Sequence, residues 1–398
     1  MQEHQGERLF SIVFSIVSFY MLNQSLLEYH IIFLKRFSII NVVTLLLFFI
    51  LLVSLSRNLD VRVDRKKMIV FIFFLLVVTM GLISSIGSSY SSIKTTGLDL
   101  FLFSRFMIVY MFIIIFFSHD MKKKATDILI VELKCLTIFN FTLLFFNLLF
   151  HFLPYFDIRY GFEAQQLLYS HPTYLGSLSF FCWYFLKNDR KDIVFNFMNI
   201  CLIISTLRSK LIILMIVYYL FYLFEKGNKI DFKKIILPIF GNGLLLLLFK
   251  GQIEGKLINN EAAIRYILMS NAKKIAIDCF PLGSGFGTYG SFTSFKYYSI
   301  LYQKLGMNTV YGLLPNFYAF GMDSYYSMVL GQFGFLGLIF YILMLWFLCS
   351  SFLNLKHFEL KKYAFILFLL LSFFTESTLN SSIGLVLFGI LALDEKGC

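Results

Sequence analysis

The sequence predicts an all-α polytopic membrane protein with about 12 transmembrane helices, and two observations carry this prediction. First, 59% of the 398 residues are hydrophobic and only 15% are charged, whereas soluble domains carry about 25% charged residues. Second, apolar stretches alternate with short clusters of Lys and Arg that fall on every second connection. Because this distribution follows the positive-inside rule, the net charge of +12 does not predict a nucleic-acid-binding surface.

Twelve apolar stretches are predicted as spans, since about 20 apolar residues cross the hydrocarbon core of a bilayer. They are residues 9–27, 38–56, 68–86, 99–118, 128–152, 173–187, 193–207, 211–224, 235–249, 325–350, 363–375 and 382–393. No small-residue cleavage site follows residues 1–8, so we expect the first span to be retained and not removed as a signal peptide. The chain is therefore predicted to be one integral-membrane domain, residues 1–398.

The connections between these spans differ in charge on the two sides. Five connections are rich in Lys and Arg and are predicted to be cytoplasmic, together with both termini. They are Arg57–Lys67, His119–Asp127, Lys187–Asp192, Glu225–Lys234 and Asn354–Lys362. The one long connection, residues 250–322 between the ninth and tenth spans, falls on the opposite side and is predicted to be an extracytoplasmic loop. Functional residues are therefore expected on the outer face.

The long loop has a helical part and a glycine-rich part. Asn259 or Asn260 is predicted to cap a helix whose first turn holds Glu261 and which ends before Pro281. Its apolar residues recur at helical spacing and its other positions carry basic residues, which predicts an amphipathic helix, either on the membrane surface or as an ordinary surface helix. The glycines that follow are predicted to permit tight turns and close backbone approach. The positions assigned to this role are Gly283, Gly285 and Gly287.

Two predicted hairpins, residues 193–224 and 363–393, are unusually short. Each of their helices has only about 15 residues, or about 22 Å at 1.5 Å per residue. If the helices end below the membrane surface, then Arg208, Lys210 and Glu376 are recessed from the outer face. A charge inside the membrane costs at least about 2.5–3.5 kcal/mol and normally faces a polar cavity. The alternative is that these side chains extend to the interface.

Three further residues on the outer side are candidates for chemistry. Asp323 stands at the start of the tenth span, where it is expected either to cap the helix or to accept a proton from a hydroxyl group. His171 precedes Pro172 and either ends its loop or acts as a base. Arg159, in the same loop of residues 154–172, is a candidate for binding an anion.

Four features of this outer face resemble one family. A Thr-Leu-Arg208-Ser-Lys turn joins two short spans, and an Asn-x-x-x-x-Arg265 helix start precedes the Pro281-Leu-Gly-Ser-Gly-Phe-Gly segment. A long outer loop holds both, and Asp323 is followed by three glycines at a spacing of three as the next span begins. Together, over about residues 155–340, they resemble the bacterial O-antigen and capsular polysaccharide polymerases (Wzy-type) and their O-antigen ligase relatives.

This resemblance implies a GT-C-like membrane glycosyltransferase that needs no metal, cofactor or nucleotide sugar. It implies transfer of a growing glycan from undecaprenyl diphosphate to the terminal sugar of another lipid-linked repeat unit. The implied diphosphate-binding residues are Arg208, then Arg265 and Arg159, and the implied base is Asp323 or His171. The implied place is the bacterial cytoplasmic (inner) membrane, as part of the cell envelope.

The implied partners are the bilayer, a lipid-linked oligosaccharide, a chain-length regulator and a flippase, but no nucleic acid. Two other functions stay open at this point. One is an O-antigen ligase-type transfer to a different acceptor, although ligase-type members often carry His where this chain has Asp323. The other is a flippase or transporter of lipid-linked oligosaccharide, for which internal repeats and broken helices would be typical. The sequence shows neither clearly.

Overall fold

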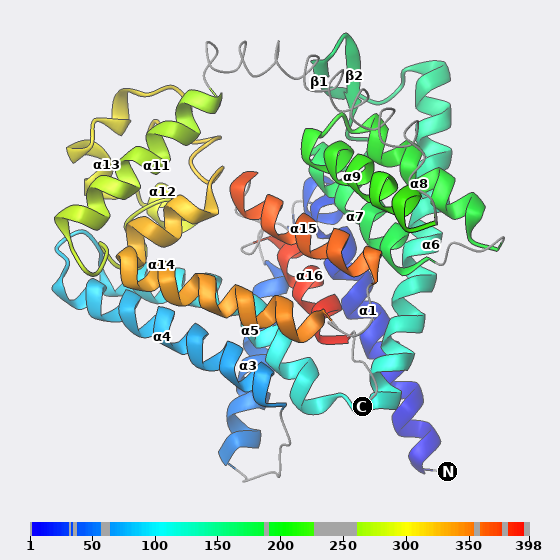
Figure 1. Ribbon diagram of the computed structural model, residues 1–398, viewed down its shortest axis with the longest axis horizontal. Coiled ribbons are helices and arrows are strands. Elements are labelled where there is room, and N and C mark those ends of the chain that lie inside the picture. Colours follow the sequence, from blue (N-terminus) through cyan, green and yellow to red (C-terminus); the bar gives the residue numbers. More distant parts are fainter. Residues whose placement is uncertain are drawn as a thin grey trace.

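The computed structural model describes residues 2–31, 33–34, 38–56, 64–186, 191–226, 261–353, 359–375 and 381–393. This part of the chain is predominantly helical (Figure 1). Its long helices are α1 (Gln2–His30), α3 (Ile39–Ser56), α4 (Arg65–Gly87), α5 (Ile93–Phe116), α6 (His119–Phe150), α9 (Ser209–Lys226), α11 (Glu261–Asp278) and α14 (Tyr325–Phe352). Its shorter helices are α7 (Pro172–Phe185), α8 (Ile193–Ser205), α12 (Phe292–Lys296), α13 (Ile300–Lys304), α15 (Leu360–Thr375) and α16 (Ser382–Leu393).

Eleven of the predicted spans coincide with helices, and the remaining one, residues 235–249, lies outside the described part of the chain. By length and composition, five helices can cross a membrane: α1, α4, α5, α6 and α14. These helices support the prediction of a multi-pass membrane protein. Two of the four helices expected to be short are short, since α8 has 13 residues and α16 has 12, whereas α9 has 18. Glu376 lies outside the described residues.

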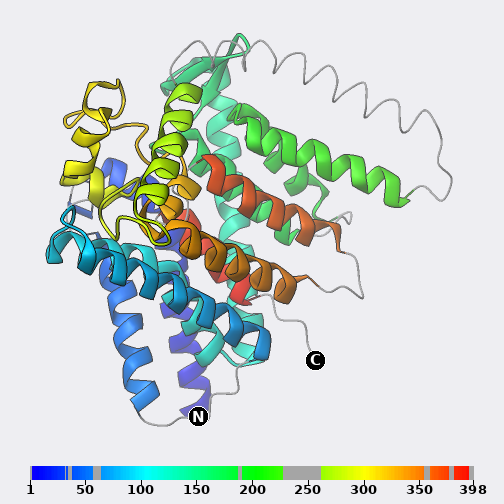
Figure 2. The ribbon, with the colours of Figure 1, turned by 60° about the vertical axis from the view of Figure 1, so that its left-hand side comes forward.

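The helices pack around a core rich in aromatic rings. In Figure 1, α4 and α14 run side by side, and in Figure 2, α15 lies beside α9. Phe103 on α5 lies at the centre of the core, with its ring centroid 5.8 Å from that of Phe74 and 5.1 Å from that of Phe333. Ring pairs at such separations add stabilisation beyond the area that they bury. These contacts join α5 to the α4–α14 pair.

A second, smaller core organises residues 261–322. The predicted helix is confirmed as α11, which begins at Glu261; Asn259 and Asn260 lie outside the described residues. The apolar face of α11 is buried through Ile264, Leu268 and Ile275, and the helix packs on α14 (Figure 1). This face therefore contacts protein, and the expectation that it rests on the membrane surface does not apply to it.

The aromatic residues of the loop also belong to this second core. Tyr289 and Tyr302 are fully buried, and their hydroxyl groups are hydrogen-bonded to the backbone at the carbonyl of Leu268 and the N–H of Gly290. Burial raises the pKa of both phenols well above the ordinary value. These two rings hold the loop together from inside.

The connection between α6 and α7 forms a structure that the sequence analysis did not predict. Residues Tyr155–Arg159 (β1) and Phe162–Gln165 (β2) pair as an antiparallel hairpin. Tyr160 and Gly161 both have positive φ, at 56° and 81°, as the tight turns of two-residue hairpins require. We call the end of the bundle that carries residues 88–92, 155–171 and 261–322 the loop end.

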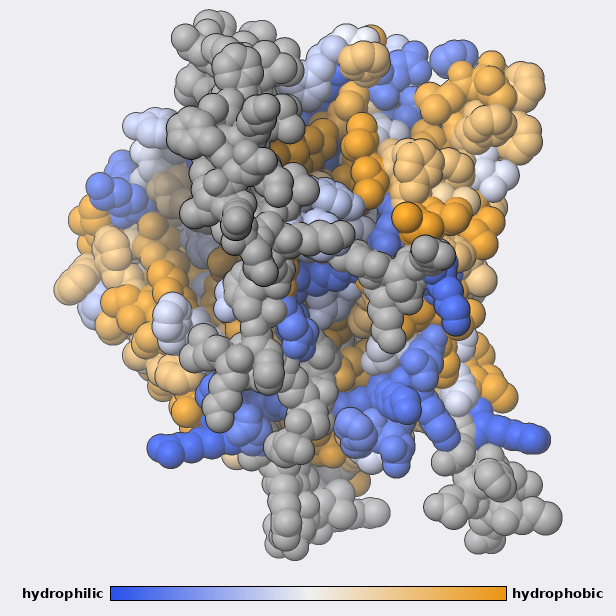
Figure 3. Space-filling view, turned by 45° about the vertical axis from the view of Figure 1, so that its right-hand side comes forward, coloured by the Kyte–Doolittle hydropathy of each residue, from blue (hydrophilic) through white to orange (hydrophobic). Residues whose placement is uncertain are grey.

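The surface has polar and apolar regions. In Figure 3, hydrophobic side chains cover much of the upper right of the face shown, and hydrophilic side chains gather along the lower part. The lower part is the end at which the N-terminus lies in Figure 1. The starts of α4 and α6 carry several of the basic residues of the chain. They are Arg65 and Lys66 on α4, and Lys123 and Lys124 on α6.

Candidate functional site

Arg208 occupies the short turn between α8 and α9 and is folded inward at the loop end. Its side chain is only 11% exposed. The guanidinium carbon lies 5.0 Å from the centroid of the Phe156 ring, and Nη2 lies 3.9 Å from Oδ1 of Asp157. Arginine favours such stacking and charge pairing because its charged group is planar and weakly hydrated. The structure therefore shows Arg208 packed against protein, and its depth relative to the membrane surface stays a prediction.

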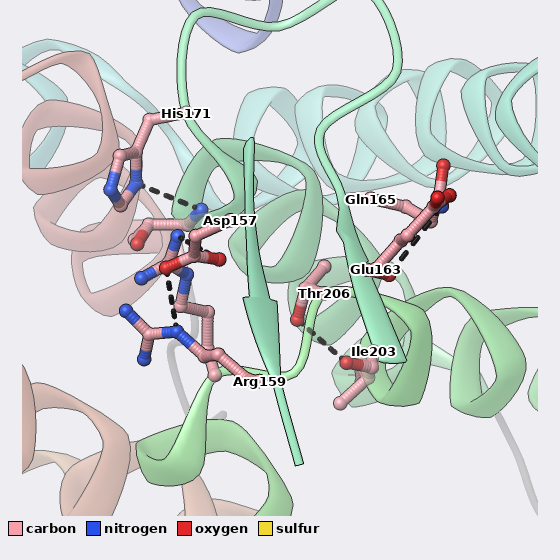
Figure 4. A network of polar contacts seen from close by, with 9 residues as sticks. Asp157, Arg159, Glu163, Gln165, His171, Ile203 and Thr206 are labelled. Atoms are coloured by element: carbon pink, nitrogen blue, oxygen red, sulfur yellow. Dashed lines mark hydrogen bonds and ion pairs between the residues drawn. The ribbon is translucent and has the colours of Figure 1, made fainter. Parts of the chain in front are cut away.

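Arg159 meets the same carboxylate from another direction. Asp157 and Arg159 are two residues apart on β1, so their side chains project from the same face of the strand. Figure 4 shows both on one side of β1, with Glu163 and Gln165 on the opposite side of the hairpin. The Nε atom of Arg159 donates to Oδ2 of Asp157 at 2.8 Å. Asp157 thus lies between two arginines, one to each carboxylate oxygen.

His171 lies next to this group and caps α7. Its Nδ1 accepts a hydrogen bond from the N–H of Thr173 at 3.2 Å, and Pro172 follows it in the first turn. Its ring packs edge to face on Phe156, with centroids 4.5 Å apart. Because Nδ1 is an acceptor here, a neutral His171 carries its proton on Nε2 and acts as a donor. The sequence-based alternative that His171 ends its loop is what the structure shows.

These five residues form one group, which we call the hairpin cluster: Phe156, Asp157, Arg159, His171 and Arg208. It combines two largely buried guanidinium groups with one carboxylate and one imidazole that are partly exposed. Arginine side chains bind phosphate oxygens through paired, charge-assisted hydrogen bonds. A ligand with more negative charge than one carboxylate can compete with Asp157 for both arginines. The cluster therefore has the chemistry of an anion site whose cations are held ready by an internal carboxylate.

The other two predicted charged residues form a second group. Arg265, on α11, donates from Nη2 to Oδ2 of Asp323 at 3.4 Å. The expectation that Asp323 caps the tenth span is wrong, because α14 begins at Tyr325 and its N-cap residue is Ser324. Asp323 lies one residue further from the helix, where its carboxylate reaches across to α11. The structure thus pairs one predicted phosphate ligand with one predicted base.

The glycine segment fixes the position of the long loop on the bundle. Ser284 and Gly285 donate their N–H groups to the carbonyls of Gly331 and Gln332 on α14, both at 2.9 Å. A side chain at Gly283 would clash with the backbone of Gln332. Gly285 and Gly287 have φ values of 93° and 73°, which glycine adopts without strain. These glycines position the loop, and no ligand contact is needed to explain them.

Asp99 anchors the same segment and was not identified in the sequence analysis. This residue on α5 is 3% exposed. Its Oδ2 accepts the N–H of Gly287 at 2.7 Å and the amide of Gln332 at 2.9 Å. Its place at the start of an apolar span was a signal, because a carboxylate at such a position needs hydrogen-bond donors.

Arg105 is the second residue that the sequence analysis missed. It lies two turns further along α5, is 6% exposed, and donates from Nη1 to Oδ1 of Asn41 at 2.7 Å. It borders a polar cavity of about 670 Å³ at the loop end. A single arginine in the predicted span 99–118 was a sufficient signal, since charged residues in spans usually mark functional positions.

In the part of the chain that the structure describes, no group of three or more His, Cys, Asp or Glu side chains is placed to hold a metal ion. No protein-family model matches the sequence, and a search of curated proteins gives no match. A function is therefore inferred from the geometry and chemistry of the residues themselves.

Proposed function

We propose that this protein is a membrane glycosyltransferase that polymerises lipid-linked saccharide units. In this proposal it moves a growing glycan from undecaprenyl diphosphate to the terminal sugar of another lipid-linked unit, as the resemblance to Wzy-type polymerases implies. The observation that carries the proposal is the hairpin cluster, where Arg159 and Arg208 converge on one carboxylate at the loop end. Two arginines that share one anion are suited to a diphosphate, which offers oxygens to both.

The chemical demand of the reaction explains why arginines are needed. When the sugar C1–oxygen bond breaks, the electron pair stays on the diphosphate, whose negative charge increases. Contacts that strengthen as charge develops lower the barrier of that step. Arg208 is inward-facing and Arg159 is next to it, so both can stay in contact with the diphosphate as its negative charge increases. His171 can add a hydrogen bond from Nε2, because its Nδ1 is already an acceptor.

The acceptor hydroxyl must lose its proton as its oxygen bonds to C1. Asp323 is the proposed base in this step, since a carboxylate can accept a proton from a positioned hydroxyl. Arg265 orients this carboxylate at 3.4 Å. The proton then lies on Asp323, the new glycosidic bond is formed, and undecaprenyl diphosphate is released. His171 is the weaker candidate for the base because the atom that could accept the proton caps α7.

The remaining parts of the proposal concern the membrane. About 12 spans are proposed from the apolar stretches, and cytoplasmic termini and a loop end that faces outward from the charge distribution. A GT-C-like arrangement is proposed because the resemblance to Wzy-type polymerases implies it. The proposed location is the inner membrane of a bacterium, and the proposed partners are a flippase, which supplies the substrate, and a chain-length regulator. The short helix α8 supports this arrangement, since it has only 13 residues and ends three residues before Arg208.

The test is the chain length of the surface polysaccharide in cells that carry variants of this protein. Arg208→Ala should abolish long polymer while single lipid-linked units persist on the outer face. Lys273→Ala, on an exposed position of α11, is the matched control and should leave polymer length unchanged. Full-length polymer from Arg208→Ala would reject the assignment. Substrate trapped on the inner face would indicate a flippase, and normal free polymer that is no longer attached to its final acceptor would indicate a ligase.

A further inference from the structure

A polar cavity of about 670 Å³ lies at the loop end between α1, α3, α5, α7 and α12. Small-molecule sites in proteins generally measure about 300–1,000 Å³, so the cavity is large enough for a ligand. Its wall combines charged and aromatic side chains. They include Glu28, Tyr29, Arg105, Tyr174, Phe292 and Lys296.

Arg105 and Glu28 form the charged centre of this wall. Arg105 is held by Asn41 at 2.7 Å, and Glu28 lines the same cavity. Glu28 is itself held in place, because its Oε1 accepts from Gln24 at 2.8 Å and from the Tyr20 hydroxyl at 3.1 Å. The pair is therefore fixed before a ligand arrives.

The balance of charges indicates the class of ligand. Lys296 is exposed at the cavity and lies 5.7 Å from the ring centroid of Phe292. An anion would meet the repulsion of Glu28 as well as the attraction of the cations. A saccharide hydroxyl both donates and accepts, so it can satisfy a carboxylate and a guanidinium together. Aromatic rings such as those of Tyr29 and Phe292 offer apolar faces for the sugar ring.

The cavity is linked along the chain to both groups of the candidate site. Ser170 lines it, and the next residue is His171 of the hairpin cluster. Met322 lines it too, and the next residue is Asp323. The charged residues of the two groups are not themselves in its lining, so a ligand here is held by a separate set of side chains.

We propose that this cavity binds the terminal saccharide of the acceptor, with Glu28 and Arg105 hydrogen-bonded to its hydroxyl groups. The identification of the ligand as an acceptor rests on the proposed function, whereas the affinity of the cavity for a saccharide does not. Glu28 accepts hydrogen bonds from the sugar and Arg105 donates them. Both are binding residues that hold the acceptor for attack.

The experiment uses the purified full-length protein in detergent micelles and ligand-observed NMR. The probes are the saccharide repeat unit freed from its lipid by mild acid, inorganic diphosphate, and undecaprenyl phosphate without a sugar. Glu28→Gln should weaken binding of the saccharide by about tenfold or more, because it loses hydrogen bonds to a charged group. The same variant should leave diphosphate binding unchanged, and Arg208→Ala should show the reverse pattern.

Two further variants keep this test decisive. Asp278→Asn removes an exposed carboxylate outside the cavity and should bind the saccharide as the wild type does. Asn41→Ala keeps both cavity charges but releases Arg105, and should weaken saccharide binding. Its melting temperature should also fall, because a buried guanidinium loses a partner, so binding is compared at a temperature at which the variant is still folded.

Wild-type saccharide affinity in both Glu28→Gln and Asn41→Ala overturns the proposal, as does displacement of the saccharide by undecaprenyl phosphate alone. Glu28-dependent saccharide binding by a protein whose deletion leaves polymer length unchanged would reject the proposed polymerase and retain the saccharide site.

Discussion

The Oδ2 atom of Asp99 on α5 accepts a hydrogen bond from the side-chain amide of Gln332 on α14, although 233 residues separate the two along the chain. The same oxygen accepts the N–H of Gly287 in the glycine segment. One buried carboxylate therefore joins a helix of the first half of the chain, a helix of the second half, and the loop that precedes it. The long loop is held on the bundle through this point.

The first prediction concerns the stability that Asp99 provides. Asp99→Ala leaves the Gly287 N–H and the Gln332 amide without this acceptor, and each buried unsatisfied group costs about 1–3 kcal/mol. We expect a clear fall in the melting temperature of the purified protein, followed by intrinsic fluorescence. Asp99→Asn keeps one oxygen as an acceptor, so its melting temperature should fall less than that of Asp99→Ala. An exposed carboxylate is the control, and Asp278→Asn should melt as the wild type does. Equal melting of Asp99→Ala and the control would contradict the anchoring role.

Most helices could be predicted because burial in a membrane demands long apolar stretches, which are visible locally. The β1–β2 hairpin was missed because it is short and sits between two such stretches. Its signals were the alternation of apolar and charged residues between Phe156 and Arg159 and the Tyr160-Gly161 turn. Both signals are weak beside the long apolar stretches on either side. Gly334, where φ is 69° inside α14, was also read as ordinary helix, because its conformation depends on the distant Leu282 that packs against it.

The candidate site was predicted in part. Arg159, Arg208 and His171 were chosen separately, and the structure brings them together. Asp157, two residues before Arg159, was not identified, because the two side chains share one face only in the β1–β2 hairpin, which the sequence analysis did not predict. Asp323 was expected to cap a helix, and its pairing with Arg265 depends on how α11 folds back on α14, which no local pattern reveals.

A second prediction separates the structural and chemical roles of His171. Loss of an N-cap acceptor costs about 0.5–2 kcal/mol, so His171→Ala should lower the stability of the protein. His171→Asn offers another good N-cap and should restore it. If His171 only caps and donates a hydrogen bond, His171→Asn should still make polymer, at a reduced rate. Complete loss of polymer in a stable His171→Asn protein would instead assign the base to His171 and not to Asp323. Thermal melting and polysaccharide chain length are the two measurements.

The last prediction concerns Asp157, whose oxygens lie 2.8 Å from Arg159 and 3.9 Å from Arg208. An anionic ligand must displace this carboxylate or share the arginines with it. Asp157→Asn keeps the shape and removes the charge, so the purified protein should bind inorganic diphosphate more tightly, by about tenfold, or ~1.4 kcal/mol.

Salt should weaken this gain, because the attraction is electrostatic. The double variant Asp157→Asn with Arg208→Ala should lose the gain in diphosphate affinity. The control Asp278→Asn should bind diphosphate as the wild type does. Turnover need not rise with affinity, because diphosphate is also a product mimic and tighter binding slows its release. Unchanged or weaker diphosphate binding in a stably folded Asp157→Asn protein would mean that the two arginines serve the hairpin alone, and the anion site would then have to be sought at Arg265.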